Sequence, residues 1–479
     1  MKRIVYFILP IILTACSTDF INLLPQSTVS IDVLYKTDKD FQDAVIGGYA
    51  VLQSQYTNMY IFGDMRADDS EQLVVKADAW SESDLFTIAS TSSTINSTWQ
   101  NYYRIIYRTN MVLSKLEEAD PAIVTNKDRH TGEAKFLRAL AYFDLVRIFG
   151  DVPLVTKPIG AKESLETPRE KVDAVYEVII SDLISAEQLL PPSYTGVNVG
   201  RATRGAAKTL LGKVYLTRHD FAKAESKLQE VTTMGYSLLA DFNALYDYTK
   251  DEHHSEYIFD IEYASGNNVS NSMTNRFAPN EGVFLQFSGI AGIGGEANSP
   301  TDDLRNLFDD NDKRKYVSVA VFGGWINGEG KFVPFNNAGT NKSYTRKYFA
   351  RVPSSDDSPA NWKVTRYGDV VLMYAEALNE NGKTAEALTW LNKIRERADV
   401  STYTGLSKDE TREAIYTERR LELCFEGHRW FDLLRTGRAL DNEVLKAKGI
   451  RPMHLLFPVP WSQVQVVNNK SIFWQNEGY

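Results

Sequence analysis

One stretch of the sequence, residues 126–153, constrains the fold more than any other part of the chain. Its apolar residues fall on two faces of one helix, the first made by Leu137, Ala141, Leu145 and Ile148 and the second by Phe136, Leu140 and Phe143. A helix that is apolar on two faces must be covered from both sides. The stretch therefore predicts a helix inside a helical assembly. It ends where Gly150 can adopt a left-handed conformation and Pro153 prevents continuation.

Three charged residues interrupt the apolar surface of this helix. They are Arg138, Asp144 and Arg147. Charges at this depth need a partner, and the i,i+3 spacing predicts an ion pair between Asp144 and Arg147. Arg138 is predicted to belong to a buried charge network, so its loss would destabilise the protein.

Amphipathic helices recur along most of the remaining chain. Three-and-four spacing predicts helices from about Asp40 to Tyr56, at 96–116, and from Glu410 to Glu426. It also predicts one helix pair at 203–217 and 220–233 and a second pair within 366–397. Two of these regions repeat a spacing similar to the tetratricopeptide repeat, through Leu211, Gly212, Tyr215, Ala224 and Leu228 and again through Tyr374, Ala375, Leu378, Gly382, Ala387 and Leu391. The predicted fold is mainly α, with tetratricopeptide-like helix pairs forming a right-handed α/α superhelical scaffold.

A further helix start is predicted at a local motif. Thr167, Pro168, Arg169 and Glu170 form a capping-box pattern with proline at the first helical position. The following apolar stripe, from Val172 onward, keeps helical spacing. The sequence therefore predicts that this helix begins at Thr167.

The middle of the chain has a different texture. Residues 266–339 hold 11 of the 29 glycines, with many asparagines and aromatic residues, and residues 257–263 alternate like a strand. This composition predicts a loop-rich, partly β insertion at about 236–365, where binding residues tend to collect on a rigid scaffold.

Four stretches of the chain carry a family resemblance. They are EAKFLRALAYFDLVRIFGDVPLV, RYGDVVLMYAEALNENGKTAEALTWLNKIRERA, ERRLELCFEGHRWFDLLRTGR and the terminal LFPVPWSQVQVVNNKSIFWQNEGY. In this order they resemble the SusD/RagB family of outer-membrane nutrient-binding lipoproteins. The resemblance implies a protein that binds nutrients without cleaving them. It also implies that the lipoprotein sits as a lid over a SusC-like, TonB-dependent barrel.

The N-terminus predicts the compartment. A basic head, Met1-Lys2-Arg3, precedes the apolar run Ile4 to Leu13, which is too short to span a bilayer. The next residues, Leu13-Thr14-Ala15-Cys16, look like a bacterial lipobox in which Cys16 is lipidated; the alternative is an ordinary signal peptide with a chance cysteine. Residues 1–15 are thus predicted to be a lipoprotein signal peptide and 16–30 a lipidated tether to the outer membrane at the cell surface.

The remainder, 31–479, is predicted to be a single SusD-like body. Its helical scaffold covers about 31–235 and 366–440, and its C-terminal segment covers about 441–479. The net charge of -9 excludes an electrostatic route to nucleic acid. The second cysteine, Cys424, lies in an apolar context and is predicted to be a core residue.

The sequence offers no catalytic constellation. Glu418, Glu422 and Glu426 follow one another at i,i+4, and carboxylates about 5 to 9 Å apart can serve a glycosidase. With Arg419, Arg420 and Arg429 nearby, a structural ion-pair network is the simpler interpretation. Asp251-Glu252-His253-His254 is interpreted as a solvated loop and not a metal site, since no further ligand follows at metal spacing. Nothing in the sequence points to a bound cofactor.

Two groups of residues are predicted to bind the ligand. A sugar ring stacks its C–H face on an indole or phenol while its hydroxyls need polar partners at the edge. The two groups are Trp80 with Arg66, Asp68 and Asp69, and Trp325 with Phe284, Phe322 and Asn327. The alternative is that each aromatic residue is only the local core of its loop.

Three functions follow from this reading. The first is a surface lipoprotein that captures oligosaccharides and delivers them to a SusC-like transporter. The second uses the same scaffold for peptides, as in the RagB branch. The third is a surface glycosidase that uses the glutamates of 418–426.

Overall fold

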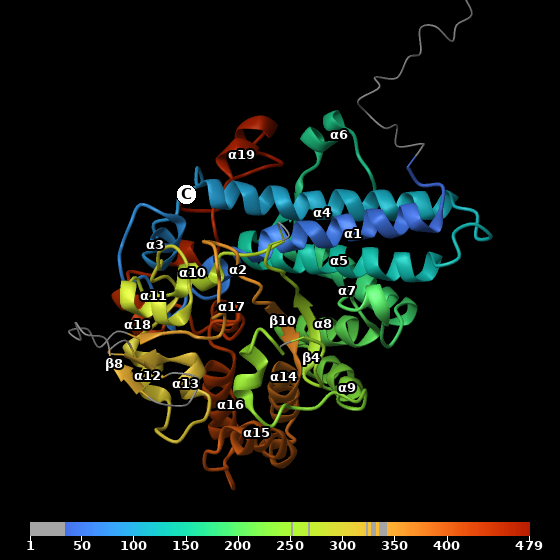
Figure 1. The fold of residues 1–479 in the computed structure, drawn as a ribbon. Coiled ribbons are helices and arrows are strands. Elements are labelled where there is room, and N and C mark those ends of the chain that lie inside the picture. The colour runs from blue at the N-terminus through green and yellow to red at the C-terminus, as the bar shows by residue number, and fades with distance from the viewer. Residues whose placement is uncertain (1–33, 251, 267–268, 322–323, 327–331, 335–342) are drawn as a thin grey trace, which may run out of the picture.

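The protein is described by a computed structural model that covers residues 34–250, 252–266, 269–321, 324–326, 332–334 and 343–479. Several predictions concern residues outside these ranges: Cys16, the leader 1–15, the tether 16–30, Phe322 and Asn327. The described body is mostly helical, with short two-stranded sheets (Figure 1).

The N-terminal part of the scaffold is a layer of long helices. They are α1 (Asp38–Tyr56), α4 (Ser93–Glu118), α5 (Lys127–Phe149) and α7 (Val172–Leu189). The first of them begins at a capping box, in which the Asp40 amide donates to Thr37 Oγ1 and the Thr37 amide donates to Asp40 Oδ2. Helices α1, α4 and α5 run side by side in Figure 1, and α7 packs on α5.

Helix α5 is covered from several sides, as its two apolar faces predict. It contacts α1, α4, α7 and α8, and nearly all its residues from Gly132 to Phe149 are buried. It ends at Gly150, whose φ of 74° is combined with a ψ of -128°, so the glycine has positive φ but lies outside the left-handed helical region. A Cβ at this position would lie 2.8 Å from Leu456 Cδ1, which gives a second reason for glycine here.

The helix layer continues through further helices, which come from two parts of the chain that are far apart in the sequence. Its members are α8 (Arg204–Thr217), α9 (Phe221–Thr232), α14 (Tyr367–Glu380), α15 (Thr384–Ala398) and α16 (Lys408–Leu423). Each of these helices contacts the next one. This includes α9 and α14, although the whole insertion separates these two helices in the sequence. The predicted mainly α scaffold of tetratricopeptide-like helix pairs with a loop-rich, partly β insertion is confirmed.

The insertion leaves and re-enters the scaffold at one place. Strand β4 (Tyr257–Ile261) pairs antiparallel with β10 (Trp362–Arg366), so the two ends of the insertion are joined and α9 can meet α14. Within and around the insertion the other ladders are β1 (Ser70–Glu71) with β5 (Ser299–Pro300), β6 (Ala320–Val321) with β9 (Ser343–Tyr344), and β7 (Gly324–Ile326) with β8 (Phe332–Pro334).

Short helices complete the body. Those near the insertion are α2 (Met59–Gly63), α3 (Ala79–Asp84), α10 (Met273–Phe277), α11 (Gly282–Ser288), α12 (Asp302–Leu307) and α13 (Lys315–Ser318). The others are α6 (Ala161–Glu166), α17 (Arg429–Arg435), α18 (Glu443–Ala447) and α19 (Trp461–Val467). None of the helices in the described part of the chain has an apolar run long enough to cross a bilayer.

The predicted helix start at Thr167 is wrong. Helix α7 begins at Val172, and residues 169–170 form β3 (Arg169–Glu170), which pairs with β2 (Val152–Pro153). The reason is a set of long-range contacts from Arg169, whose amide donates to the Ile472 carbonyl at 2.9 Å and whose guanidinium donates to Asn476 Oδ1 at 2.7 Å. These contacts with the C-terminal segment override the local capping pattern.

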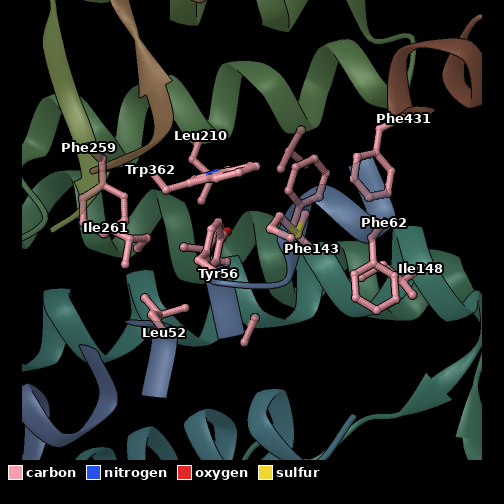
Figure 2. Packing of buried hydrophobic residues seen from close by; sticks show 14 of the residues in the cluster. Leu52, Tyr56, Phe62, Phe143, Ile148, Leu210, Phe259, Ile261, Trp362 and Phe431 are labelled. Atoms are coloured by element: carbon pink, nitrogen blue, oxygen red, sulfur yellow. The ribbon is translucent and has the colours of Figure 1, made fainter. Parts of the chain in front are cut away.

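Scaffold and insertion share one hydrophobic core. In Figure 2, side chains from seven elements meet in this core: Leu52 and Tyr56 of α1, Phe62 of α2, Phe143 and Ile148 of α5, Leu210 of α8, Phe259 and Ile261 of β4, Trp362 of β10, and Phe431 of α17. Trp362 is among the largest fully buried side chains and stacks on Tyr348 with ring centroids 5.2 Å apart. The insertion therefore packs against the helices through this shared core.

Candidate functional site

A polar cavity of about 540 Å³ lies where α3 faces α10 and two loops of the insertion. Its lining residues come from five separate segments: Thr57; Lys76 and Trp80; Ser270, Asn271, Ser272, Asn275 and Arg276; Ile293, Gly294 and Gly295; and Ser355 and Asp356. Its volume falls in the range of small-molecule sites, about 300 to 1,000 Å³. This cavity, called the Trp80 cavity below, is the candidate ligand site.

Trp80 is the aromatic residue of the cavity. It is the second residue of α3, whose start is capped by Asp78 Oδ1 accepting from the Ser81 amide at 2.9 Å. The helix is anchored to the body by Ser83 Oγ, which donates to the Ile61 carbonyl at 2.7 Å. Trp80 is half-buried, so the indole is held in place while part of its surface remains open to the cavity.

Arg276 contributes a cation beside the indole. Its Cζ lies 5.6 Å from the Trp80 ring centroid. Its Nη1 donates to the Thr57 carbonyl and to Asn58 Oδ1, both at 2.9 Å, so the guanidinium is oriented by the end of α1. The pair gives the cavity one apolar face with hydrogen-bond donors at its edge.

A second part of the cavity lining depends on two glycines. A Cβ on Gly294 would lie 2.3 Å from the Pro279 carbonyl oxygen, and one on Gly295 would lie 2.6 Å from the Arg276 carbonyl oxygen. Only glycine allows this backbone to approach α10 so closely. Asn275 completes this part of the lining by donating to the Ala291 carbonyl at 2.8 Å and accepting from the Asp356 amide at 3.1 Å.

This arrangement suits a polyhydroxylated ligand. An indole face, a guanidinium, amides, hydroxyls and the Asp356 carboxylate line one open cavity. A sugar ring can stack on the indole while the polar groups exchange hydrogen bonds with its hydroxyls. Of the eight predicted ligand-binding residues, the cavity includes Trp80.

Arg66 is placed elsewhere. Its side chain is fully buried, with Cζ 3.9 Å from the Phe457 ring centroid and Nη2 donating to the Tyr479 hydroxyl at 3.0 Å. Burial lowers the pKa of Arg66 from its ordinary value. The structure gives this residue a packing role against the C-terminal segment, and the interpretation of Arg66 as a ligand contact is corrected accordingly.

Asp68 and Asp69 are buried ion-pair partners. Asp68 accepts two hydrogen bonds of 2.7 Å from Arg429, and Asp69 pairs with Arg420. Both carboxylates are at most 1% exposed, so they have no surface to offer a ligand. The interpretation of these two residues as ligand contacts is also corrected, because they bind the arginines of α16 and α17 instead.

The second predicted group is only partly described. Phe284 of α11 is 1% exposed and packs edge-to-face on Tyr344 and Phe349, at centroid distances of 5.2 and 5.3 Å. It is thus core to its loop, as the alternative interpretation holds. The backbone of Trp325 pairs with Val333 between β7 and β8. Phe322 and Asn327 lie outside the described residues.

Sequence reasoning missed most of the polar lining. Asn275, Arg276 and Asp356 belong to segments that carry no motif. The one available signal was composition, since the excess of asparagine and glycine after residue 266 marked this region as irregular. Which of its polar residues meet Trp80 depends on folding contacts more than 190 positions apart.

The three glutamates 418, 422 and 426 form a buried network of ion pairs, as predicted. Glu418 pairs with Arg314 and Arg395 at 2.6 Å each, Glu422 with Arg366 at 2.6 Å, and Glu426 with Lys347 at 2.6 Å and Arg366 at 2.8 Å. The predicted partners are wrong: Arg419 binds Asp369 and Asp432, and Arg420 and Arg429 bind Asp68 and Asp69.

The electrostatics of this network fit a structural role. Burial by itself raises the pKa of Glu422, but the guanidinium groups of Arg397, Arg366 and Arg314 outweigh it and hold the pKa below its ordinary range. A general acid needs the opposite shift. Burial also raises the pKa of the Cys424 thiol to about 12, which removes its nucleophilic form. Among the described residues, no cluster of three or more His, Cys, Asp or Glu side chains could hold a metal ion.

Two family models match the chain, one in each half. Residues 249–472 match the SusD family, and residues 19–216 match a SusD-like family described as starch-binding and associating with the outer membrane. The SusD-like protein P2 of Formosa agariphila is 28% identical over 518 residues, which cover 100% of this chain and 99% of the relative.

Solved structures agree with the family models. A laminarin-binding SusD-like protein superposes with a TM-score of 0.77 at 28% identity, covering 93% of this chain and 100% of the other. A SusD superfamily protein from Parabacteroides distasonis gives a TM-score of 0.77 at 27% identity, covering 91% and 99%. Between them the two family models match most of the sequence, and the fold agrees over almost its whole length. The chain belongs to the SusD-like family of proteins.

Proposed function

We propose that this protein is a cell-surface binding protein that captures oligosaccharides and delivers them to a SusC-like, TonB-dependent transporter in the outer membrane. The observation that carries the proposal is the half-buried Trp80 indole beside Arg276 in an open polar cavity of about 540 Å³. This combination of one stacking face and many hydroxyl partners is what a sugar chain requires.

Laminarin is the first glycan to test. The relative described as laminarin-binding is 28% identical to this chain over nearly its full length, and a β-glucan therefore heads the candidates. Binding of laminarin to the purified protein is measured by isothermal titration calorimetry, followed by a panel of other soluble polysaccharides.

Trp80→Ala tests the site. Loss of the stacking face is expected to cost about 1 to 3 kcal/mol of glycan affinity, with no change in thermal midpoint. The matched control is Trp461→Ala on α19, since Trp461 is 45% exposed and lines no part of the Trp80 cavity. Equal affinity of the parent and Trp80→Ala would remove the site assignment. Trp325→Ala tests the second predicted aromatic in the same way.

Peptide binding is the alternative function for the same scaffold. If the protein binds peptides, peptide pull-downs should capture it while no glycan of the panel binds. This result would make peptide binding the favoured function and glycan binding the alternative. The carboxylate, hydroxyl and amide groups around Trp80 favour the glycan, because an extended peptide calls for a strand edge or an apolar groove.

We also propose that the protein binds its cargo without cleaving it. The support is the buried pairing of Glu418, Glu422 and Glu426, which are at most 1% exposed. Incubation with the polysaccharide panel should release no new reducing ends. Turnover that Glu422→Gln abolishes would instead establish the glycosidase.

The anchor and partner complete the proposal. Residues 1–15 act as a signal peptide, Cys16 is lipidated, 16–30 tether the protein, and 31–479 form one body over the transporter. The family description as associating with the outer membrane supports this placement. Cys16→Ser should move the protein from the membrane fraction to the soluble fraction of the producing cell. A transporter of this class should co-purify with the lipidated form.

A further inference from the structure

Two irregular segments of the insertion contribute to the lining of the Trp80 cavity. We call residues 289–298 the 293 loop and residues 352–358 the 356 turn. They meet in one isolated parallel bridge, between Ile290 and Val352. A segment with so few ladder hydrogen bonds keeps one shape only where other groups hold its backbone. The lining residues that these two segments supply are Ile293, Gly294, Gly295, Ser355 and Asp356.

One side chain, Asn275 of α10, fastens both segments. Its Nδ2 donates to the carbonyls of Ala291 at 2.8 Å and Ile293 at 3.3 Å. Its Oδ1 accepts from the Asp356 amide at 3.1 Å. The Asn275 carbonyl also accepts from the Gly295 amide, at 2.8 Å. The residue is 4% exposed, so a buried amide with both donors and its acceptor in use joins α10 to the 293 loop and the 356 turn.

The backbone of Asp356 needs such support. Its φ is 58°, in the left-handed region that is unfavourable for a residue with a Cβ. A backbone in this region persists where its surroundings hold it, and the bond from its amide to Asn275 is one such contact. The Asp356 side chain is exposed and lines the cavity. Asn275 therefore helps to place an accessible carboxylate, a strong acceptor for hydroxyl groups, in the lining.

The two segments also pack directly on each other at Gly292. A Cβ added there would lie 2.8 Å from Ser355 Oγ and 3.3 Å from Asn275 Nδ2. The φ of Gly292 is 89°, which glycine adopts readily and other residues rarely do. Gly292 is not among the residues that line the Trp80 cavity. It therefore serves the contact between the 293 loop, the 356 turn and Asn275 without meeting a ligand.

We propose that Asn275 is the positioning residue of the Trp80 cavity, which holds the 293 loop and the 356 turn in the binding arrangement before the ligand arrives. The nature of the ligand rests on the proposed function, whereas the fastening of the two segments rests on the contacts above. A site that is already ordered loses no affinity to the ordering of its own loops. If only a fraction of the molecules has the competent arrangement, the apparent affinity falls by that fraction.

Two variants loosen the segments from different sides. Asn275→Asp keeps the size of the side chain and an acceptor for the Asp356 amide, but it replaces the NH₂ group by an oxygen that faces two carbonyls. Gly292→Ala inserts a methyl group between the two segments and leaves Asn275 in place. The matched control is Asn392→Asp on α15, because Asn392 likewise donates to the carbonyl of Tyr403 and accepts from its amide, both at 2.9 Å.

The first measurement needs no ligand. Hydrogen exchange followed by mass spectrometry should show faster exchange of the amides of 289–298 and 352–358 in Asn275→Asp and in Gly292→Ala than in the parent. Asn392→Asp should leave these two segments unchanged and affect only the neighbourhood of Tyr403. Thermal midpoints check folding, and Gly292→Ala keeps the test valid if Asn275→Asp destabilises the protein.

The second measurement is stopped-flow tryptophan fluorescence with laminarihexaose, maltohexaose and xylohexaose. For a hexasaccharide that the parent binds, both variants should lower the association rate constant roughly tenfold, because fewer molecules have the competent arrangement. The dissociation rate constant should stay within about twofold, since the bound arrangement is the same. Asn392→Asp should match the parent in both rate constants.

Two results would overturn the positioning role. One is exchange in both segments as slow in the two variants as in the parent. The other is a loss of affinity that Asn275→Asp shows only in the dissociation rate constant and Gly292→Ala does not show, since this pattern belongs to a direct ligand contact. Absence of binding to all three hexasaccharides in the parent would count against the proposed function, and the exchange rates alone would then decide whether Asn275 fastens the two segments.

Discussion

Arg138 on α5 shows how much stability a single buried charge controls. Its guanidinium binds both oxygens of Asp182, at 2.7 and 2.8 Å, and donates to Asn110 Oδ1 at 2.7 Å and the Thr156 carbonyl at 2.9 Å. Arg138→Ala would leave Asp182, which is 3% exposed, as an unpaired buried carboxylate. We expect a loss of about 3 to 5 kcal/mol in the free energy of unfolding, measured by urea denaturation.

The matched control is Arg438→Ala. Arg438 also pairs with one carboxylate, Glu413, but the two side chains are 39% and 59% exposed. An exposed pair of this kind contributes at most about 1 kcal/mol. Equal losses in the two variants would contradict the assignment of Arg138 to a buried network.

The sequence predicts the ion pair within α5, but it does not predict which residues pair with buried charges elsewhere. The Asp144–Arg147 pair follows from helical spacing and is present. Asp68 and Asp69 looked like surface residues because their neighbours are polar, yet arginines about 350 positions away bind them. The local sequence cannot reveal such partners, because the residues come together only when the chain folds.

Helix α2 depends on a close approach between two glycines. A Cβ on Gly63 would lie 2.4 Å from the carbonyl oxygen of Gly427, which is backbone and cannot move aside. Gly63→Ala must therefore displace α2 from the turn between α16 and α17. We expect a loss of about 1 to 3 kcal/mol or more, seen as a lower thermal midpoint.

Gly160→Ala serves as the comparison for this element. Gly160 precedes α6 with φ -80°, and no heavy atom lies within 4 Å of the Cβ that alanine would add. The thermal midpoint of the Gly160→Ala variant should equal that of the parent protein or exceed it slightly. A Gly63→Ala protein as stable as the parent would show that the two backbones are not in contact.

The elements themselves were largely predictable. Helices with sustained three-and-four spacing, such as α1, α5 and α8, appear within a few residues of their predicted bounds. The failure at Thr167 has a clear cause, since Arg169 pairs with β2 and the C-terminal segment instead of starting a helix. Local capping signals decide a helix start only where no distant partner competes for the same backbone.

For the whole molecule, buried histidines make stability depend on pH. Burial lowers the pKa of His454 to about 4, whereas an unfolded histidine titrates near about 6.5. Between these values the unfolded state binds a proton that the folded state does not, so stability falls as the pH is lowered from about 6.5 to about 4. Burial also lowers the pKa of His428, to about 3, and this shift likewise reduces stability as the pH falls. Burial raises the pKa of Asp64, and this shift has the opposite effect on stability, because the folded state then binds the proton more readily.

The contribution of one histidine is isolated by His454→Phe, which keeps a ring to stack on Phe86, 5.0 Å away. We expect the unfolding free energy of the parent to fall more steeply than that of the variant, by up to about 1.4 kcal/mol per pH unit. Urea denaturation at pH 7 and pH 5 gives the two slopes. Identical slopes would mean that His454 titrates alike in both states.

The site and the whole molecule were predictable to different degrees. The prediction that Trp80 contacts the ligand came from its setting in a polar segment, and the structure places this residue in the lining of the Trp80 cavity. Composition indicated that the region around residue 270 is irregular. The sequence did not indicate that Arg201, Tyr236 and His254 line one cavity, because they come from three segments that carry no common motif. Residues 251–254 were interpreted as a solvated loop. A cavity is a property of the packed chain, so sequence patterns indicate where loops gather and not what they enclose.

The shared core of scaffold and insertion has a practical consequence at the loop around Val197, whose side chain is 96% exposed. A protease that cuts there severs α7 from α8, yet the helices on both sides of the cut pack into the same interior. The nicked protein should elute from a sizing column as one particle, and its two fragments should separate only in denaturant.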